Sequence, residues 1–234
     1  MPGLSSPDFV ALVFFLIAWL GYSRIIAGGR GDKRGLNHLM EEYRVAWMRE
    51  MASREQRMVD SGVMASLQNG TAFFASTSIL AIGGSAALLR GADDAVKVFS
   101  ELSFGLTPSR GLFELKVIGL LIIFGYAFFK FAWAYRLFNF TAILIGATPS
   151  RNSPDADARD RMALRAAAMS SAAGRHFSRG QRAFFFALAY LGWFLGPWVF
   201  IGMTAAVVYV MWARQFASDA RLALFPPGDT RGAP

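Results

Sequence analysis

The chain has 234 residues, of which 54% are hydrophobic and 17% are charged, and its formal net charge is +8. Soluble domains usually carry about 25% charged residues, so this composition is typical of a membrane protein. The lack of cysteine excludes disulfides, thiolate metal sites and cysteine nucleophiles. The sequence holds no motif of a known nucleic-acid-binding module, so we expect no nucleic-acid partner and assign the positive charge to an anionic lipid surface.

The first apolar run, residues 9–27, is long enough to cross a bilayer as a helix. Arg24 lies in its last turn, where a long side chain can reach the interface. A cleaved signal peptide is the alternative, because Ala27 precedes two glycines and so forms a possible cleavage site. No basic residue precedes the run, and Arg24 separates it from that site, which favours a retained helix.

An amphipathic helix is predicted from Leu36 to Met51. Its apolar residues recur at spacings of three or four, and charged residues fill the other side. The residues of the expected apolar face are Leu36, Met40, Tyr43, Trp47 and Met51. Such a helix lies on the inner leaflet or packs against another cytoplasmic segment.

The second predicted span, residues 70–89, belongs to a stretch without charge between Asp60 and Arg90. Small residues fall close to one face of this helix, where they let another helix approach. They are Ala72, Ser76, Gly83 and Ala87.

The third predicted span, residues 112–136, carries Lys130 toward its cytoplasmic end. At 1.5 Å per residue, Lys130 lies about 27 Å from Leu112, near the far side of a hydrocarbon core roughly 30 Å thick. One interpretation is that Lys130 and Arg136 extend to the headgroups, with Trp133 and Tyr135 as interfacial aromatics. The other keeps Lys130 inward, where it binds an anion or a lipid phosphate.

A second amphipathic helix is predicted from Asp155 to about Phe177, with Ser153 and Pro154 as its start signal. The fourth predicted span, residues 184–210, follows it, and we expect a kink at Pro197. Residues 1–216 are thus predicted to form one membrane-helix bundle domain. Residues 217–234 are predicted to be a disordered tail.

Charge orients these segments. Seven arginine or lysine residues lie within residues 30–57 and seven arginines within residues 151–182, whereas the connection between the second and third spans has only three basic residues. By the positive-inside rule both arginine-rich segments are cytoplasmic. The chain is therefore predicted to be an all-α, multi-pass protein of the inner (plasma) membrane, with both termini outside.

Three stretches carry a family resemblance. They are RVAWMREMASREQRMVDSGVMASLQNGTAFFASTSILAIGG at 44–84, RLFNFTAILIGATP at 136–149 and FSRGQRAFFFALAYLGWFLGPWVF at 177–200. In their order and polar punctuation they resemble the bacterial and plant membrane proteins called domain of unknown function 599, over roughly residues 10 to 215. The resemblance implies several membrane helices, with these blocks at their cytoplasmic ends. It implies no activity.

A polar cluster at the inner leaflet is the candidate binding site. Its members end the second and third spans on the predicted cytoplasmic side: Gln68, Asn69, Lys130, Arg136 and Asn139. A basic pocket there suits a lipid headgroup or a small anion. The alternative is structural, with the amides capping helix ends and bridging neighbouring helices.

Catalytic motifs and metal-site spacings are not found in the sequence, so we expect no enzyme activity, no cofactor and no metal. His38 and His176 are interpreted as surface residues. The leading hypothesis is a non-enzymatic accessory or scaffold bundle that packs in the bilayer against itself or other membrane proteins. The alternative is a small oligomeric transporter or channel for an anion or lipid.

Overall fold

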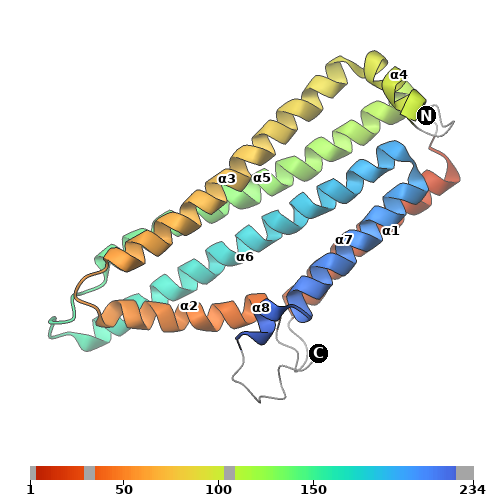
Figure 1. The fold of residues 1–234 in the computed structure, drawn as a ribbon. Coiled ribbons are helices and arrows are strands. Elements are labelled where there is room, and N and C mark those ends of the chain that lie inside the picture. The colour runs from red at the N-terminus through yellow and green to blue at the C-terminus, as the bar shows by residue number, and fades with distance from the viewer. Residues whose placement is uncertain (1–3, 29–34, 103–108, 225–234) are drawn as a thin grey trace. The chain divides into compact units, whose positions relative to one another are not determined.

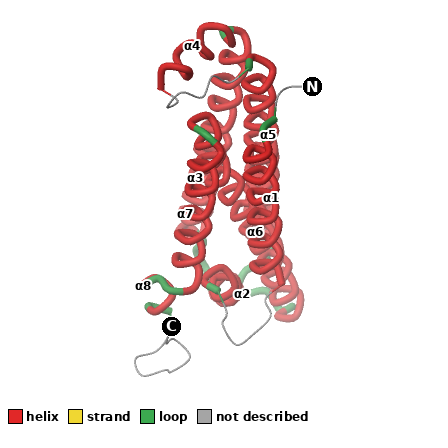
Figure 2. Tube along the Cα trace, turned by 90° about the vertical axis from the view of Figure 1, so that its right-hand side faces the viewer, coloured by secondary structure: helices red, strands yellow, loops and turns green. Residues whose placement is uncertain are grey.

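The computed structural model describes residues 4–28, 35–102 and 109–224, and this part of the chain is built of helices without a strand (Figure 1, Figure 2). In chain order the helices are α1 (Ser6–Gly28), α2 (Leu36–Ser53), α3 (Met58–Arg90), α4 (Ala92–Leu102), α5 (Arg110–Ala147), α6 (Ala156–Leu195), α7 (Pro197–Phe216) and α8 (Asp219–Leu222). The all-α prediction is confirmed.

Four of the described helices are long and apolar enough to cross a membrane: α1, α3, α5 and α7. Large apolar side chains remain exposed along them, including Ile17, Leu80, Phe129 and Trp198. A surface this apolar is expected where a helix faces lipid. The chain is therefore compatible with a multi-pass membrane protein.

The chain divides into two compact units. Unit 1 comprises Met1–Gly35, Thr77–Ala127 and Gln181–Pro234, and unit 2 comprises Leu36–Ser76 and Phe128–Gly180. Helices α3, α5 and α6 each contribute one part to either unit. These three helices run through both units without a break. The expectation of one bundle domain over residues 1–216 stays a prediction.

Unit 1 is built around aromatic side chains. Phe15 of α1 packs edge-on against Phe186 and Tyr190 of α6, with ring centroids 5.6 and 5.5 Å apart, and lies 5.0 Å from Phe200 of α7. Trp193 stacks on Phe200 at 5.4 Å. Rings at these separations add to the free energy gained from burial.

The predicted fourth span over residues 184–210 is wrong as a single helix. Helix α6 ends at Leu195, and Gly196 adopts a φ of 140°, a conformation that glycine reaches readily because it has no Cβ. Pro197 then occupies the first turn of α7, where its missing N–H costs no hydrogen bond. The chain reverses at Gly196 rather than kinking, and α7 runs back beside α1 (Figure 1).

Helices α1 and α7 run parallel in unit 1. Asp8, near the start of α1, contacts Trp193 beside the Gly196 turn. Gly35, after α1, lies against the side chain of Gln215, near the end of α7. The start of α1 and the end of α7 therefore lie at opposite ends of this unit.

The core of unit 2 contains Met48 and Met51 of α2, together with Met64 of α3, Phe138 of α5 and Ala166 of α6. The predicted amphipathic helix is confirmed as α2, but its buried face differs from the prediction.

Helix α2 turns the side with Leu39, Met48 and Met51 inward, whereas Met40 and Tyr43 are exposed. The three-and-four spacing identified a helix. It did not fix which of two neighbouring apolar stripes meets the core.

Helix α6 joins two segments that the sequence suggested were separate. Asp155 precedes the helix, and its Oδ1 accepts a hydrogen bond from the Ala158 backbone N–H at 2.7 Å, so Asp155 caps a helix that begins close to the predicted position. The helix then continues to Leu195 without a break. In the predicted tail, residues 219–222 form the short helix α8, and residues 225–234 lie outside the described residues.

Candidate functional site

The structure brings together two members of the predicted polar cluster. The Gln68 Nε2 of α3 donates a hydrogen bond to Asn139 Oδ1 of α5 at 2.7 Å, and both residues are half-buried in unit 2. The bond joins two apolar helices through amide side chains, which suits either a polar bridge or a binding site.

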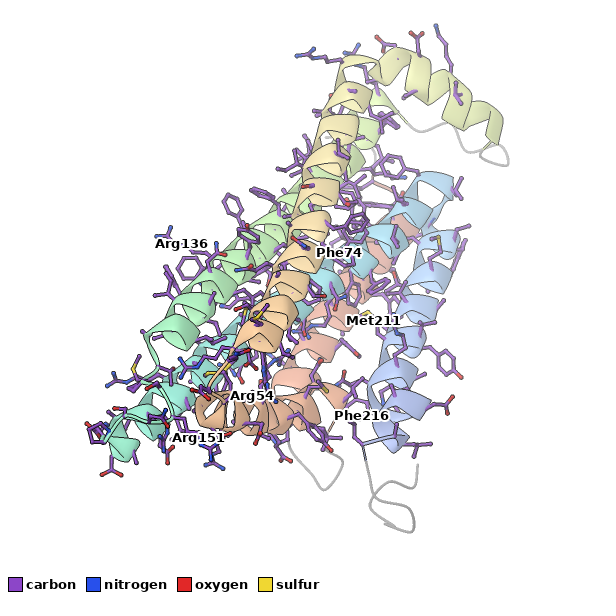
Figure 3. All side chains as sticks on the ribbon, turned by 60° about the vertical axis from the view of Figure 1, so that its left-hand side comes forward. Arg54, Phe74, Arg136, Arg151, Met211 and Phe216 are labelled. Carbon is purple, nitrogen blue, oxygen red and sulfur yellow. The ribbon has the colours of Figure 1, made fainter. Side chains whose placement is uncertain are left out.

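The other three predicted residues are arranged differently. Asn69 and Arg136 are exposed, and Arg136 projects from α5 with its guanidinium 5.4 Å from the Phe140 ring centroid (Figure 3). Lys130 is half-buried and acts electrostatically on His176 of α6. A single binding site made of all five residues therefore stays a prediction, with the Gln68–Asn139 bond as its described contact.

His176 is a half-buried residue of unit 2, and its interpretation as a surface histidine is wrong. Its ring lies edge-on to Trp133, with centroids 6.4 Å apart, and its buried Nδ1 has no hydrogen-bond partner in the described part of the chain. Burial, and then the charges of Lys130, Arg179 and Arg175, lower the pKa of His176 below its ordinary value of 6.5. A neutral imidazole is therefore favoured at neutral pH.

Arg44 is also half-buried, although its place in α2 suggested a solvated charge. Its guanidinium lies against the Cα of Gly174 in α6, so close that a Cβ built there would be 2.6 Å from Nη1 and from Nη2. Burial lowers the pKa of Arg44, and the neighbouring Glu41 opposes that shift. Glu41 Oε1 is itself 3.1 Å from Nη1 of Arg175.

A second polar group in unit 2 centres on Asp60, a fully buried carboxylate. Its Oδ1 accepts hydrogen bonds from Trp47 Nε1 at 2.7 Å and from Arg54 Nη1 at 2.8 Å. Arg57 donates to the carbonyl oxygens of Ile145, Thr148 and Pro149 at 2.6–2.9 Å. It thus caps the C-terminal end of α5, where carbonyl groups lack helical partners.

Unit 1 holds a polar group that the sequence did not reveal. Trp193 Nε1 donates to Asp8 Oδ1 at 2.7 Å, and Lys116 Nζ donates to the Trp193 carbonyl oxygen at 2.8 Å. Asp8 is 6% exposed and Lys116 is 5% exposed. Asp8 lay just outside the predicted span of residues 9–27, so the sequence showed no acidic residue in that apolar core.

None of these groups is a metal centre by composition, since the described residues contain no set of three histidine, aspartate or glutamate side chains placed to hold an ion. Their common feature is an arginine, lysine or carboxylate withdrawn from water. In unit 1 and around Asp60 the charges have partners within the chain. At His176 the neighbouring charges are cations, whereas Arg44 is influenced by both Glu41 and Arg175.

Comparison with known protein families gives a match over most of the chain. No curated protein and no solved structure matches the chain. The family model described as "Protein of unknown function, DUF599" matches residues 10–220, which is nearly the whole chain. The resemblance found in the three sequence stretches is thereby confirmed, and the chain belongs to the DUF599 family.

Proposed function

We propose that this protein is a non-enzymatic accessory bundle of the cell's inner membrane, which packs through helix α3 against a transmembrane helix of another membrane protein or of a second copy. The observation that supports this proposal is the outer face of α3. That helix carries small residues on two sides. One side is buried by packing within the chain, and the other is exposed.

The inner side of α3 bears Thr71, Ser78 and Ser85, spaced seven residues apart and all buried. A seven-residue spacing returns to nearly the same helix face, so these three side chains form one stripe. Thr71 and Ser85 donate to the carbonyl oxygens of Leu67 and Ala81, which satisfies the hydroxyls within the helix. This stripe is the side on which α3 packs within the chain.

The outer side of α3 bears the predicted small residues. Ser76, Gly83 and Ala87 are exposed and Ala72 is half-buried. A Cβ added to Gly83 or to Gly84 would meet nothing within 4 Å. Glycine within a helix costs roughly 0.5–1 kcal/mol relative to alanine, and no contact among the described residues requires glycine at these positions. Close approach of another helix would explain it.

The orientation in the membrane is also a proposal. The expectation of both termini outside counted residues 184–210 as one crossing. Because the chain instead reverses at Gly196, we infer that the C-terminal part of α6 is a fifth crossing, which puts the start of α1 outside and the end of α7 inside. This arrangement places Arg214 and Arg221 on the side of the two arginine-rich segments, as the positive-inside rule favours.

Cysteine crosslinking in native membranes tests the proposed contact, since the chain has no cysteine of its own. Ser76→Cys, Gly83→Cys and Ala87→Cys, each labelled with a thiol-reactive photocrosslinker, are expected to give an adduct whose mass identifies a second copy or another membrane protein. Leu88→Cys is the control, because Leu88 is exposed one residue further along and about 100° around the helix. Adducts that are equal at Leu88, or missing at all three positions, would contradict the proposal.

A further inference from the structure

Unit 2 contains a basic cluster that takes no part in the proposed packing of α3. It consists of one side chain of α2, one of α5 and three of α6: Arg44, Lys130, Arg175, His176 and Arg179. The electrostatic influence of Arg175 reaches both Arg44 and His176, and that of Lys130 and Arg179 reaches His176. The five groups are therefore electrostatic neighbours.

Arg44 is the most confined member. Its guanidinium lies over Gly174, whose missing side chain provides the space. In the described part of the chain, Arg44 has no hydrogen bond or ion pair. Glu41 is the acid whose charge acts on Arg44, and its carboxylate accepts a hydrogen bond from Arg175. A guanidinium has five N–H donors, and an anion can accept from those that the chain leaves unpaired.

The charge balance of the cluster has one sign. Three cationic side chains act on the His176 imidazole, Lys130, Arg175 and Arg179, and the charged groups that act on it are all cations. Like charges held together raise the free energy of the folded state unless an anion compensates them. Because Glu41 pairs with Arg175, the Arg44 guanidinium keeps donors that no acceptor among the described residues uses.

We propose that the basic cluster binds a phosphate group, with the Arg44 guanidinium as its anchor. Guanidinium groups pair with phosphate oxygens in a bidentate manner, and lysine and histidine add single donors. The exposed side chains of Trp133 and Tyr135 follow Lys130 within two turns of α5, and aromatic residues of this kind mark the headgroup level of a bilayer. An anionic lipid headgroup is therefore the source that fits, and a soluble phosphate compound shares its chemistry.

The site does not require α3 to have a partner, so its failure and that of the proposed function are separable. Full-length protein in mild detergent is examined by native mass spectrometry with phosphatidylglycerol or phosphatidylcholine. The parent protein is expected to retain phosphatidylglycerol, and Arg44→Gln to retain about tenfold less, the loss expected for one charge-assisted hydrogen bond. Arg49→Gln removes the same charge from an exposed position on α2 and should retain the lipid as the parent does.

A second variant covers the case in which Arg44→Gln does not fold. Gly174→Ala keeps every charge but forces the guanidinium to move, and it too should weaken retention of phosphatidylglycerol. Lipid-free protein with inorganic phosphate separates the two sources. If phosphate at millimolar concentration stabilises the parent and not Arg44→Gln, the site accepts soluble phosphate as well. Equal retention by the parent, Gly174→Ala and any folded Arg44→Gln, together with no effect of phosphate, would overturn the proposal.

Discussion

Both units bury a carboxylate under a tryptophan, yet they neutralise it differently. In unit 1 the Trp193 indole donates to Asp8, and in unit 2 the Trp47 indole donates to Asp60, each at 2.7 Å. The cation differs between them. Lys116 donates to the Trp193 carbonyl oxygen and acts on Asp8 without touching it, whereas Arg54 bonds Asp60 directly at 2.8 Å.

The difference in solvent access matters more than the difference in contact. Lys116 is 5% exposed, so it depends on Asp8 for its compensating charge. The Arg54 side chain is 36% exposed and can be hydrated without its partner. A charge with access to water loses little when its partner is removed, whereas a buried charge loses its only compensation. Loss of the Asp60–Arg54 pair should therefore cost less stability than loss of the Asp8 charge near Lys116.

The largest expected effect comes from removing each carboxylate in turn. Asp8→Asn leaves Lys116 buried without a counter-charge and should lower the free energy of unfolding by about 3–5 kcal/mol. Asp60→Asn keeps an acceptor for Trp47 and releases Arg54 to water, so about 1 kcal/mol is expected. Thermal or chemical unfolding of the purified variants in one detergent measures both.

A double variant provides the control for this comparison. Adding Lys116→Met to Asp8→Asn removes the stranded charge and should recover much of the lost stability. Equal losses for Asp8→Asn and Asp60→Asn would show that solvent access of the cation does not determine the cost.

A second difference concerns the glycines on which side chains rest. A Cβ on Gly119 in unit 1 would collide with the buried Tyr190 hydroxyl and lie 2.8 Å from its Cζ, and that ring is held on several sides. Gly119→Ala should therefore cost about 1–3 kcal/mol, as overpacking of a core does. Tyr190→Phe in the same chain should return part of that loss.

The corresponding change in unit 2 has another outcome. The three atoms nearest to a Cβ on Gly174 all belong to the end of the Arg44 side chain, which can move aside, so the unfolding midpoint of Gly174→Ala should stay the same or rise slightly. If Gly174→Ala destabilises as much as Gly119→Ala, the guanidinium is held more firmly than its contacts indicate.

The parts of the fold that the sequence predicted are those with a local cause. Apolar length identified α1, α3 and α5, and helical periodicity identified α2. The reversal at Gly196 was missed because the segments before and after it are both apolar. Hydropathy does not indicate in which direction a helix runs. Gly196 and Pro197 marked an interruption, but whether the chain kinks or reverses depends on contacts such as Trp193 with Phe200.

The candidate site follows the same rule. Gln68 and Asn139 were predicted to meet because both end an apolar run on the same side of the membrane. The bond between Trp193 and Asp8 joins residues 185 positions apart, and no local pattern relates them. Arg44 belonged to a charged helix face in the sequence, and only the packing of Gly174 beneath it shows that its charge is confined.

A smaller effect should distinguish the amide pair of unit 2 from the charged pairs. Gln68→Leu and Asn139→Leu each remove one side of a hydrogen bond, and the double variant completes a thermodynamic cycle. We expect a coupling free energy of about 0.6 kcal/mol, typical of such bonds between membrane helices. Unfolding in detergent measures it, and a coupling near zero would mean that the two amides are held by other partners.

The smallest expected effect is the pH dependence that His176 gives to unit 2. Its pKa is lowered in the folded protein by burial and by Lys130, Arg179 and Arg175, so the unfolded chain binds the proton more tightly. Stability should therefore be unaffected by His176 at pH 8 and should fall as the pH decreases below about 6.5.

His176→Gln should make that fall shallower. His38→Gln, on α2, is the control, because it also removes one imidazole. An anion bound at the basic cluster would raise the pKa of His176 by its negative charge. Phosphatidylglycerol should then reduce the loss of stability at acid pH in the parent protein and have little effect on that loss in His176→Gln. An acid limb that is identical in the parent and in His176→Gln would show that other groups cause the loss of stability.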